Sequence, residues 1–105
     1  MKEILTIDQG TTSSRSIIFN ESFEITQESQ QEYDLSYPKD GWVEADPNDI
    51  LDSVKKTLNT VLNASQSLSN ITGCGITNQR ESTVIWEKSS GNAIYPVIIW
   101  QDRRT

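Results

Sequence analysis

The sequence has 105 residues, enough for one small domain with its own hydrophobic core. Its formal net charge of -6, with no block of Lys or Arg, argues against nucleic acid or an anionic membrane surface as the main partner. The lack of histidine and the single cysteine exclude the usual Cys/His zinc sites, His-based dyads and an internal disulfide, so a metal held here needs oxygen ligands, which suits Mg²⁺.

The N-terminus carries a short apolar run that reaches Asp8 too soon for a secretory signal peptide. No later run approaches the length of a membrane span. We therefore expect a cytoplasmic protein without a membrane-inserted segment.

The first strand is expected over about residues 3 to 8. It is apolar on both faces, with Ile4 on one face and Leu5 and Ile7 on the other. This pattern is typical of a strand buried in the interior of a sheet.

Two further strands follow the first one. Residues 15–19 form an apolar run, and the short link of residues 10–14 favours an antiparallel hairpin with the first strand. Residues 25–35 are rich in Gln, Glu and Ser, which predicts an exposed edge strand protected by its charge.

A helix is expected from Asp46 and Pro47 to about Ala64, because Asp is favoured at the N-cap and Pro at the first helical position. The loop before this helix contains Trp42, and both a packing role and a role in ligand contact stay open for its side chain. The core-facing side of the helix is predicted to be one apolar stripe: Ile50, Leu51, Val54, Leu58, Val61 and Leu62.

The last third of the chain predicts more strands. Residues 71–78 form one, and Cys74 within it lies between two glycines, where we expect a small buried side chain and no reactive thiol. Residues 83–86 and 97–100 are two apolar runs separated by the turn signal of residues 89–92. They predict a hairpin or an insertion built like one.

The first candidate site lies where the first strand ends. It consists of Asp8, Gly10, Thr11, Thr12, Ser13 and Arg15. Backbone N–H groups and hydroxyls can donate to phosphate oxygens, a guanidinium can neutralise their charge, and a carboxylate can hold Mg²⁺ directly or through water. The same residues fit an ordinary hairpin turn equally well, since Ser, Thr and Gly are common in turns.

The second candidate site is the run Gln79-Arg80-Glu81 together with Trp100. A guanidinium and a carboxylate can donate to and accept from hydroxyls while an indole face covers C–H groups, which suits a small polyol. Taken alone, these residues fit a surface ion pair beside a core tryptophan better. The Walker and G-x-G-x-x-G phosphate fingerprints are absent from the sequence.

Four segments, in this order and at fitting spacing, resemble the glycerol-phosphorylating members of the FGGY carbohydrate kinase family. They are residues 8–15 (DQGTTSSR), 41–47 (GWVEADP), 75–81 (GITNQRE) and 100–105 (WQDRRT). The resemblance covers essentially the whole chain. It implies an α/β fold: the first part of a ribonuclease-H-like ATPase domain of the actin/hexokinase type, with a mixed sheet that opens with three antiparallel strands followed by a helix.

The resemblance also implies roles for the candidate residues. Gly10, Thr11, Thr12, Ser13 and Arg15 would bind the phosphates of ATP or ADP, Asp8 would lie at the magnesium ion, and Arg80, Glu81 and Trp100 would line the glycerol pocket. The intact protein would phosphorylate glycerol to sn-glycerol 3-phosphate and is expected to be a homo-oligomer.

Residues 1–105 are expected to be the N-terminal part of the family's N-terminal domain, because the chain stops just after a predicted strand with nothing to cover the sheet. The resemblance implies that the catalytic base is an aspartate far downstream and that the adenine pocket belongs to a second domain. No catalytic residue is therefore expected in this fragment, and the fragment alone is expected to be inactive.

Three alternatives stay open. The first is a kinase of the same family that acts on a larger sugar such as xylulose or gluconate, although Gln79-Arg80-Glu81 favours glycerol. The second is a non-catalytic, actin-like domain that binds a nucleotide or a polyol. The third is a plain interaction domain in which both candidate sites are structural.

Overall fold

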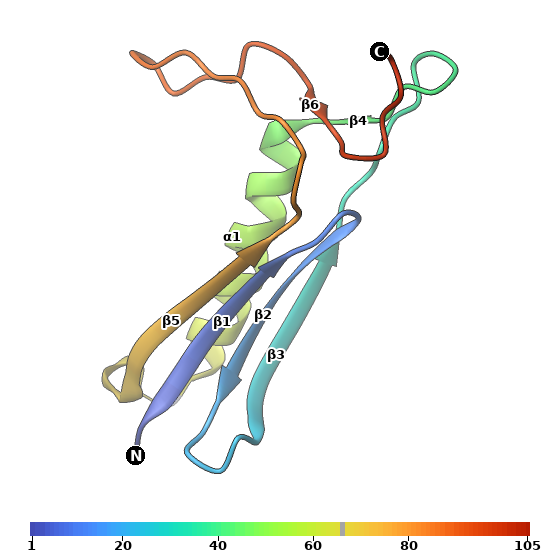
Figure 1. The fold of residues 1–105 in the computed structure, drawn as a ribbon. Helices are drawn as coiled ribbons and strands as arrows, with labels where there is room; N and C mark the ends of the chain where they lie inside the picture. The colour runs from blue at the N-terminus through green and yellow to red at the C-terminus, as the bar shows by residue number, and fades with distance from the viewer. Residues whose placement is uncertain (66) are drawn as a thin grey trace.

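Two sheets and one long helix make up the protein in the computed structural model, which describes residues 1–65 and 67–105. In chain order the elements are β1 (Glu3–Gln9), β2 (Ser13–Phe19), β3 (Ile25–Glu32), β4 (Glu44–Ala45), α1 (Pro47–Ala64), the 3-10 helix η1 (Leu68–Asn70), β5 (Ile71–Asn78) and β6 (Val97–Ile98) (Figure 1). Among these described residues, no helix combines the length and apolar character needed to cross a membrane.

The larger sheet has the strand order β3-β2-β1-β5. Strands β1, β2 and β3 are antiparallel, with Leu5 opposite Ile18, whereas β5 runs parallel to β1. The expected architecture, a mixed sheet that opens with three antiparallel strands followed by a helix, is therefore confirmed. The turn between β1 and β2 and the end of β5 lie at the same end of this sheet, next to β4 and β6 (Figure 1).

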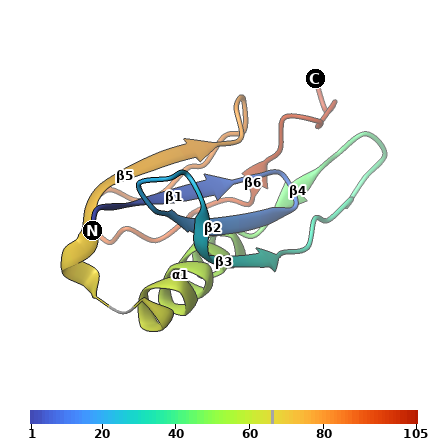
Figure 2. The ribbon, with the colours of Figure 1, turned by 90° about the horizontal axis from the view of Figure 1, so that it is seen from below.

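Helix α1 begins as the sequence predicts and packs on one face of the larger sheet (Figure 2). Asp46 is the N-cap, and its side chain accepts a hydrogen bond from the backbone N–H of Asn48 at 2.8 Å. A cap of this kind stabilises a helix by about 1 kcal/mol, because it satisfies an N–H group that has no partner within the helix.

The predicted apolar stripe of α1 is only partly correct. Leu51 is 50% exposed, and the most deeply buried helix residues are Ser53, Thr57 and Val61. The stripe prediction misses Ser53 and Thr57, because hydroxyl groups are not counted as apolar but here pair with serines of β2. Leu58 and Leu62 pack against the core between α1 and the sheet, whereas Ile50 packs against the core under the smaller sheet.

Hydroxyl pairs fill the contact between α1 and β2. Ser14 Oγ lies 2.7 Å from Ser53 Oγ, and Ser16 Oγ lies 2.8 Å from Thr57 Oγ1. Ser53 also donates to the carbonyl of Ile50, so its single proton is used and Ser14 is the donor within the first pair. The buried polar groups are thereby satisfied, as interiors require.

The apolar core has two parts. One lies between the sheet and α1 and contains Leu5, Ile18 and Val61. The other lies under the smaller sheet and contains Tyr33, Val43, Ala45, Val97 and Ile99. The second cluster ties the end of β3 to β4 and β6, and so fixes the segment that leads to Trp100.

Two parts of the larger sheet are open. On the face that points away from α1, Ile4 of β1 is 44% exposed. On the face that carries α1, the helix packs mainly on β2 and β3, so Ile76 of β5 is 73% exposed and Cys74 is exposed. The prediction that β1 is interior in the strand order is confirmed, but the predictions that it is buried on both faces and that Cys74 is buried are wrong. A single helix covers one face of β2, β3 and part of β1, and it leaves both the other face and β5 open.

Residues 83–98 form a hairpin-like excursion, and not the two full strands predicted at residues 83–86 and 97–100. Isolated bridges join Thr83 to Ile98 and Trp86 to Ala93, and only Val97–Ile98 forms a strand. That strand, β6, pairs with β4, which lies in a segment where the sequence predicts a loop. The 83–86 run pairs with β6 only at Thr83, on the edge of β6 opposite β4, and is therefore not a full strand.

Candidate functional site

The first candidate site is the tight turn between β1 and β2. The backbone N–H of Gly10 donates to the carbonyl of Ser13 at 2.8 Å and closes the turn. A Cβ atom at Gly10 would lie 3.1 Å from that same carbonyl oxygen, so any other residue would need a small shift of the turn. Thr11 and Thr12 form the tip, and Asp8 is exposed on β1 just before it.

Arg15 points away from the tip of this turn. Its guanidinium donates to Gln30 Oε1 at 2.9 Å and lies 3.7 Å from a carboxylate oxygen of Glu28, both on the edge strand β3. Its side chain is 43% exposed, so these are weak surface contacts that a stronger anion can replace. The phosphate role of Arg15 stays a prediction.

The second candidate site is an open pocket of about 470 Å³, a volume typical of small-molecule sites. It is lined by Thr11, Asn78, Gln79, Arg80, Glu81 and Trp100. The pocket includes one residue of the first candidate site, Thr11, whose Oγ1 accepts a hydrogen bond from Trp100 Nε1 at 2.8 Å. The structure thus brings together two sites that the sequence predicts separately.

Glu81 adopts a strained backbone conformation in the wall of this pocket. Its φ is 63°, in the left-handed region that residues with a Cβ rarely occupy. Such strain costs on the order of 1–3 kcal/mol and concentrates at ligand sites. The conformation turns the chain sharply after β5 and sets Arg80 and Glu81 at the pocket.

A hydrogen-bonded cluster below the turn is absent from the sequence prediction. The side-chain amide of Gln79 donates to the carbonyl of Gly10 at 3.2 Å and to the hydroxyl of Tyr33 at 3.0 Å. Gln9 donates to the same carbonyl at 2.7 Å, and the Tyr33 hydroxyl also donates to it. Burial raises the pKa of Tyr33, although its bonds to the two glutamines oppose this shift.

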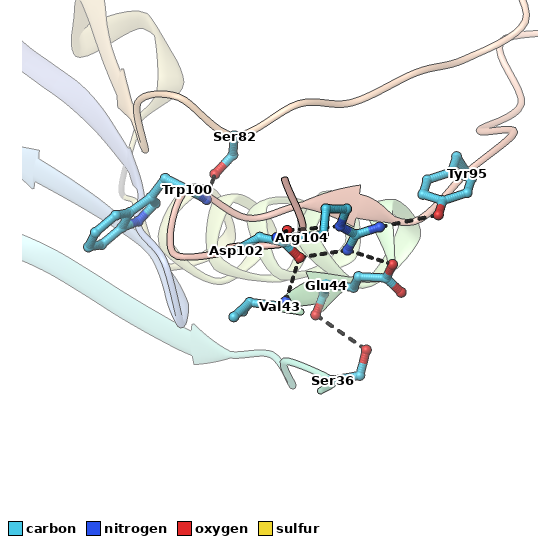
Figure 3. Close-up of polar contacts among 8 residues, drawn as sticks. All are labelled: Ser36, Val43, Glu44, Ser82, Tyr95, Trp100, Asp102 and Arg104. Atoms are coloured by element: carbon cyan, nitrogen blue, oxygen red, sulfur yellow. Dashed lines mark hydrogen bonds and ion pairs between the residues drawn. The ribbon is translucent and has the colours of Figure 1, made fainter. Parts of the chain in front are cut away.

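A second missed cluster holds the segment after Trp100 (Figure 3). The guanidinium of Arg104 binds Asp102 at 2.6 and 2.8 Å and Glu44 at 2.9 Å, and it stacks 3.8 Å from the ring centre of Trp42. Asp102 also accepts from the backbone N–H of Val43 at 2.7 Å. Hydrogen bonds from Arg104 hold the pKa of Asp102 well below its usual range, and the same contacts raise the pKa of Arg104.

Trp42 is therefore a packing residue of this second cluster. Its ring lies between Arg104 and Lys39, whose Nζ is 4.7 Å from the ring centre. Cation–π contacts of this kind hold an indole in place. The sequence signal that could have found the cluster is the pairing of two motifs, residues 41–47 and 100–105, which lie side by side.

The chemistry of Asp8 fits a magnesium ion. Within residues 1–65 and 67–105, no group of three or more His, Cys, Asp or Glu side chains gathers around a common point. Mg²⁺ keeps several waters and is commonly held by one or two carboxylates together with phosphate oxygens. A single exposed carboxylate beside a turn rich in donors matches that pattern.

Comparison with known proteins shows the family of the chain. The profile of the FGGY family of carbohydrate kinases, N-terminal domain, matches residues 3–105. The chain is 56% identical over 105 residues to a glycerol kinase of Alteromonas mediterranea and 51% identical to one of Oceanobacillus iheyensis, covering 99% of this chain and 21% of each relative. The chain thus spans about a fifth of the length of the curated relatives it matches.

Solved structures show the same fold. Plasmodium falciparum glycerol kinase with ADP matches with a TM-score of 0.88 at 31% identity, over 99% of this chain and 21% of that one. A xylulose kinase from Rhodospirillum rubrum matches with a TM-score of 0.87 at 25% identity, over 98% of this chain and 21% of that one. The α/β architecture expected for the first part of an actin-like ATPase domain is confirmed, and the chain belongs to the FGGY family of carbohydrate kinases.

Proposed function

We propose that these residues are the N-terminal part of the N-terminal domain of a kinase that transfers the γ-phosphoryl group of ATP to glycerol, giving sn-glycerol 3-phosphate. The observation that supports the proposal is the 2.8 Å hydrogen bond between Trp100 and Thr11, which connects the pocket proposed for the polyol with the turn proposed for the phosphates. Phosphoryl transfer depends mainly on positioning the acceptor hydroxyl in line with the phosphate and on stabilising charge.

The turn would bind the nucleotide through the N–H groups and hydroxyls of Gly10, Thr11, Thr12 and Ser13. Thr11 Oγ1 accepts from Trp100, so its own proton stays available to donate to a phosphate oxygen. Arg15 would exchange its surface contacts for the phosphates. Asp8 would hold Mg²⁺, which neutralises charge on the phosphates when bound.

The pocket would bind glycerol through Arg80, Glu81 and Trp100. Arg80 supplies donors and Glu81 supplies acceptors for hydroxyl groups, and both side chains are exposed at the pocket. The N–H of the Trp100 indole is occupied by Thr11, which leaves the ring face for the C–H groups of the polyol. We further propose a cytoplasmic, homo-oligomeric protein whose catalytic base and adenine pocket lie beyond these 105 residues.

A larger sugar is the second candidate substrate. The structural match to a xylulose kinase, with a TM-score of 0.87, is nearly as close as the match to a glycerol kinase, at 0.88. The fold therefore does not separate the two substrates. The identity of 56% to a protein named glycerol kinase and the Gln79-Arg80-Glu81 wall favour glycerol.

A coupled kinase assay tests the proposal on the full-length protein that carries this chain. With ATP and Mg²⁺, we expect kcat/KM for glycerol to exceed that for xylulose and gluconate by on the order of 100-fold, since a site built for particular hydroxyls rejects poor matches strongly. A preference for xylulose or gluconate would identify the second candidate as correct. No phosphorylation of any of the three would contradict both.

A further inference from the structure

A closed ring of hydrogen bonds joins the phosphate turn to the wall of the pocket. The amide of Gln79 donates to the carbonyl of Gly10 at 3.2 Å, and its Oε1 accepts from the hydroxyl of Ser82 at 2.7 Å. Ser82 accepts in turn from the backbone N–H of Trp100 at 3.0 Å (Figure 3). The indole of Trp100 then donates to Thr11, the residue that follows Gly10, and the ring closes.

The directions of these bonds are mutually consistent. Ser82 has one proton, which goes to Gln79, and a lone pair, which takes the N–H of Trp100. The amide of Gln79 is fixed in one orientation, because its nitrogen faces the carbonyl of Gly10 and its oxygen faces a hydroxyl. Exchanging O and N would place two acceptors against each other at Gly10.

Two further groups, the hydroxyl of Tyr33 and the backbone N–H of Gln79, also hold the ring through hydrogen bonds. Tyr33, which is 9% exposed, donates its hydroxyl proton to the carbonyl of Gly10 and accepts from the amide of Gln79. The backbone N–H of Gln79 donates to the carbonyl of Gln9 at 2.8 Å, which extends the pairing of β5 with β1. The turn and the exit of β5 are therefore held as one unit, and a shift of one moves the other.

We propose that Gln79 and Ser82 are positioning residues that couple nucleotide binding at the turn to acceptor binding in the pocket. This inference rests on the proposed function of the two sites. A nucleotide that orders Thr11 through its phosphates also orders Trp100. The wall of the pocket that Trp100 forms is then already ordered when the acceptor binds. By thermodynamic linkage, the acceptor tightens the nucleotide by the same factor.

The test is calorimetric titration of the full-length protein with glycerol, with and without a saturating non-hydrolysable ATP analogue and Mg²⁺. We expect the analogue to tighten glycerol binding about 5-fold or more, the lower end of typical coupling. Ser82→Ala removes both ring bonds of the hydroxyl and should reduce the tightening to less than about 2-fold. Ser82→Thr keeps the hydroxyl and should restore it.

Steady-state kinetics and a matched control separate positioning from folding. Ser82→Ala should raise KM for glycerol and for ATP together, with an unchanged thermal midpoint. Ser89→Ala, which removes an exposed hydroxyl of the 83–98 excursion, should change neither constant. If Ser82→Ala does not fold, Gln79→Glu is tested in its place. This substitution keeps the acceptor for Ser82 but removes the donor to Gly10.

Failure of this inference and failure of the proposed function give different results in these experiments. If glycerol and the analogue each bind but Ser82→Ala keeps the wild-type coupling, or the wild type has none, the inference is wrong and the proposed function stands. If neither ligand binds the wild type, the proposed function fails and the inference fails with it.

Discussion

Trp100 and Thr11 are 89 positions apart in the sequence, yet the indole N–H of Trp100 donates to the hydroxyl of Thr11 at 2.8 Å. This contact connects the turn after β1 with the segment after β6. It joins the donor-rich turn to the pocket lined by Arg80, Glu81 and Trp100. The proposed transfer of a phosphoryl group to an alcohol requires two adjacent sites of this kind.

Replacing Trp100 with Phe keeps the aromatic face and removes the N–H donor. We expect KM for glycerol to rise about 2- to 10-fold, because a neutral hydrogen bond contributes on the order of 0.5–1.5 kcal/mol. Trp86→Phe, an exposed tryptophan of the 83–98 excursion, is the control and should leave KM within 2-fold, about the size of assay scatter. Equal changes of KM in Trp100→Phe and Trp86→Phe would show that the contact between Trp100 and Thr11 does not contribute to glycerol binding.

Replacing Arg80 with Ala tests the pocket itself. Loss of a charged hydrogen-bond partner costs on the order of 1–3 kcal/mol, so kcat/KM for glycerol should fall by roughly 5- to 150-fold, mainly through KM. Lys88→Ala, which removes an exposed cation from the excursion, provides the control for net charge. An unchanged KM in Arg80→Ala would exclude Arg80 from the pocket.

Replacing Asp102 with Asn tests the cluster that holds Arg104. The pKa of this carboxylate is depressed, so its contribution to stability is present above about pH 3.9, the ordinary value for aspartate, and is lost as the pH falls below it. The thermal midpoint of Asp102→Asn should therefore lie below that of the wild type at pH 7, and the gap should narrow on acidification.

The matched control for this pH series is Asp52→Asn on the exposed side of α1. It should leave the midpoint at pH 7 unchanged. A gap between Asp102→Asn and the wild type that stays constant down to pH 3 would show that the charge of Asp102 is not what stabilises the cluster.

Replacing Ser53 with Ala tests the contact between α1 and β2. The hydroxyl of Ser14 would lose its acceptor while buried, which costs on the order of 1–3 kcal/mol of unfolding free energy. The double variant Ser14→Ala/Ser53→Ala should recover part of this loss, because no donor is then left unsatisfied. A double-mutant cycle by urea unfolding measures the coupling, and strict additivity would contradict the paired arrangement.

Local signals in the sequence were sufficient for most of the fold. Strands β1 to β3 follow from apolar periodicity and a short turn, and α1 follows from Asp46 and Pro47, because hairpins and helix caps depend on neighbouring residues. The exposure of Ile4 and Cys74 could not be predicted from such local signals. An apolar pattern tells which residues favour burial, and not which face another element covers.

The contacts within the site depend on distant parts of the chain. The predicted residues Thr11, Arg80, Glu81 and Trp100 do line one pocket, but nothing in the sequence gives the pairing of Trp100 with Thr11. Arg104 and Glu44, 60 positions apart, meet where β6 pairs with β4. The sequence predicts a loop where β4 lies, so the Arg104 cluster could not be derived from local propensity.

The strongest test of the proposed function is an assay of the full-length protein with ATP, Mg²⁺ and either glycerol or xylulose. We expect ATP-dependent formation of sn-glycerol 3-phosphate, with a kcat/KM for glycerol on the order of 100-fold above that for xylulose. Purified, folded protein that binds ATP and phosphorylates neither compound, or that prefers xylulose, would contradict it.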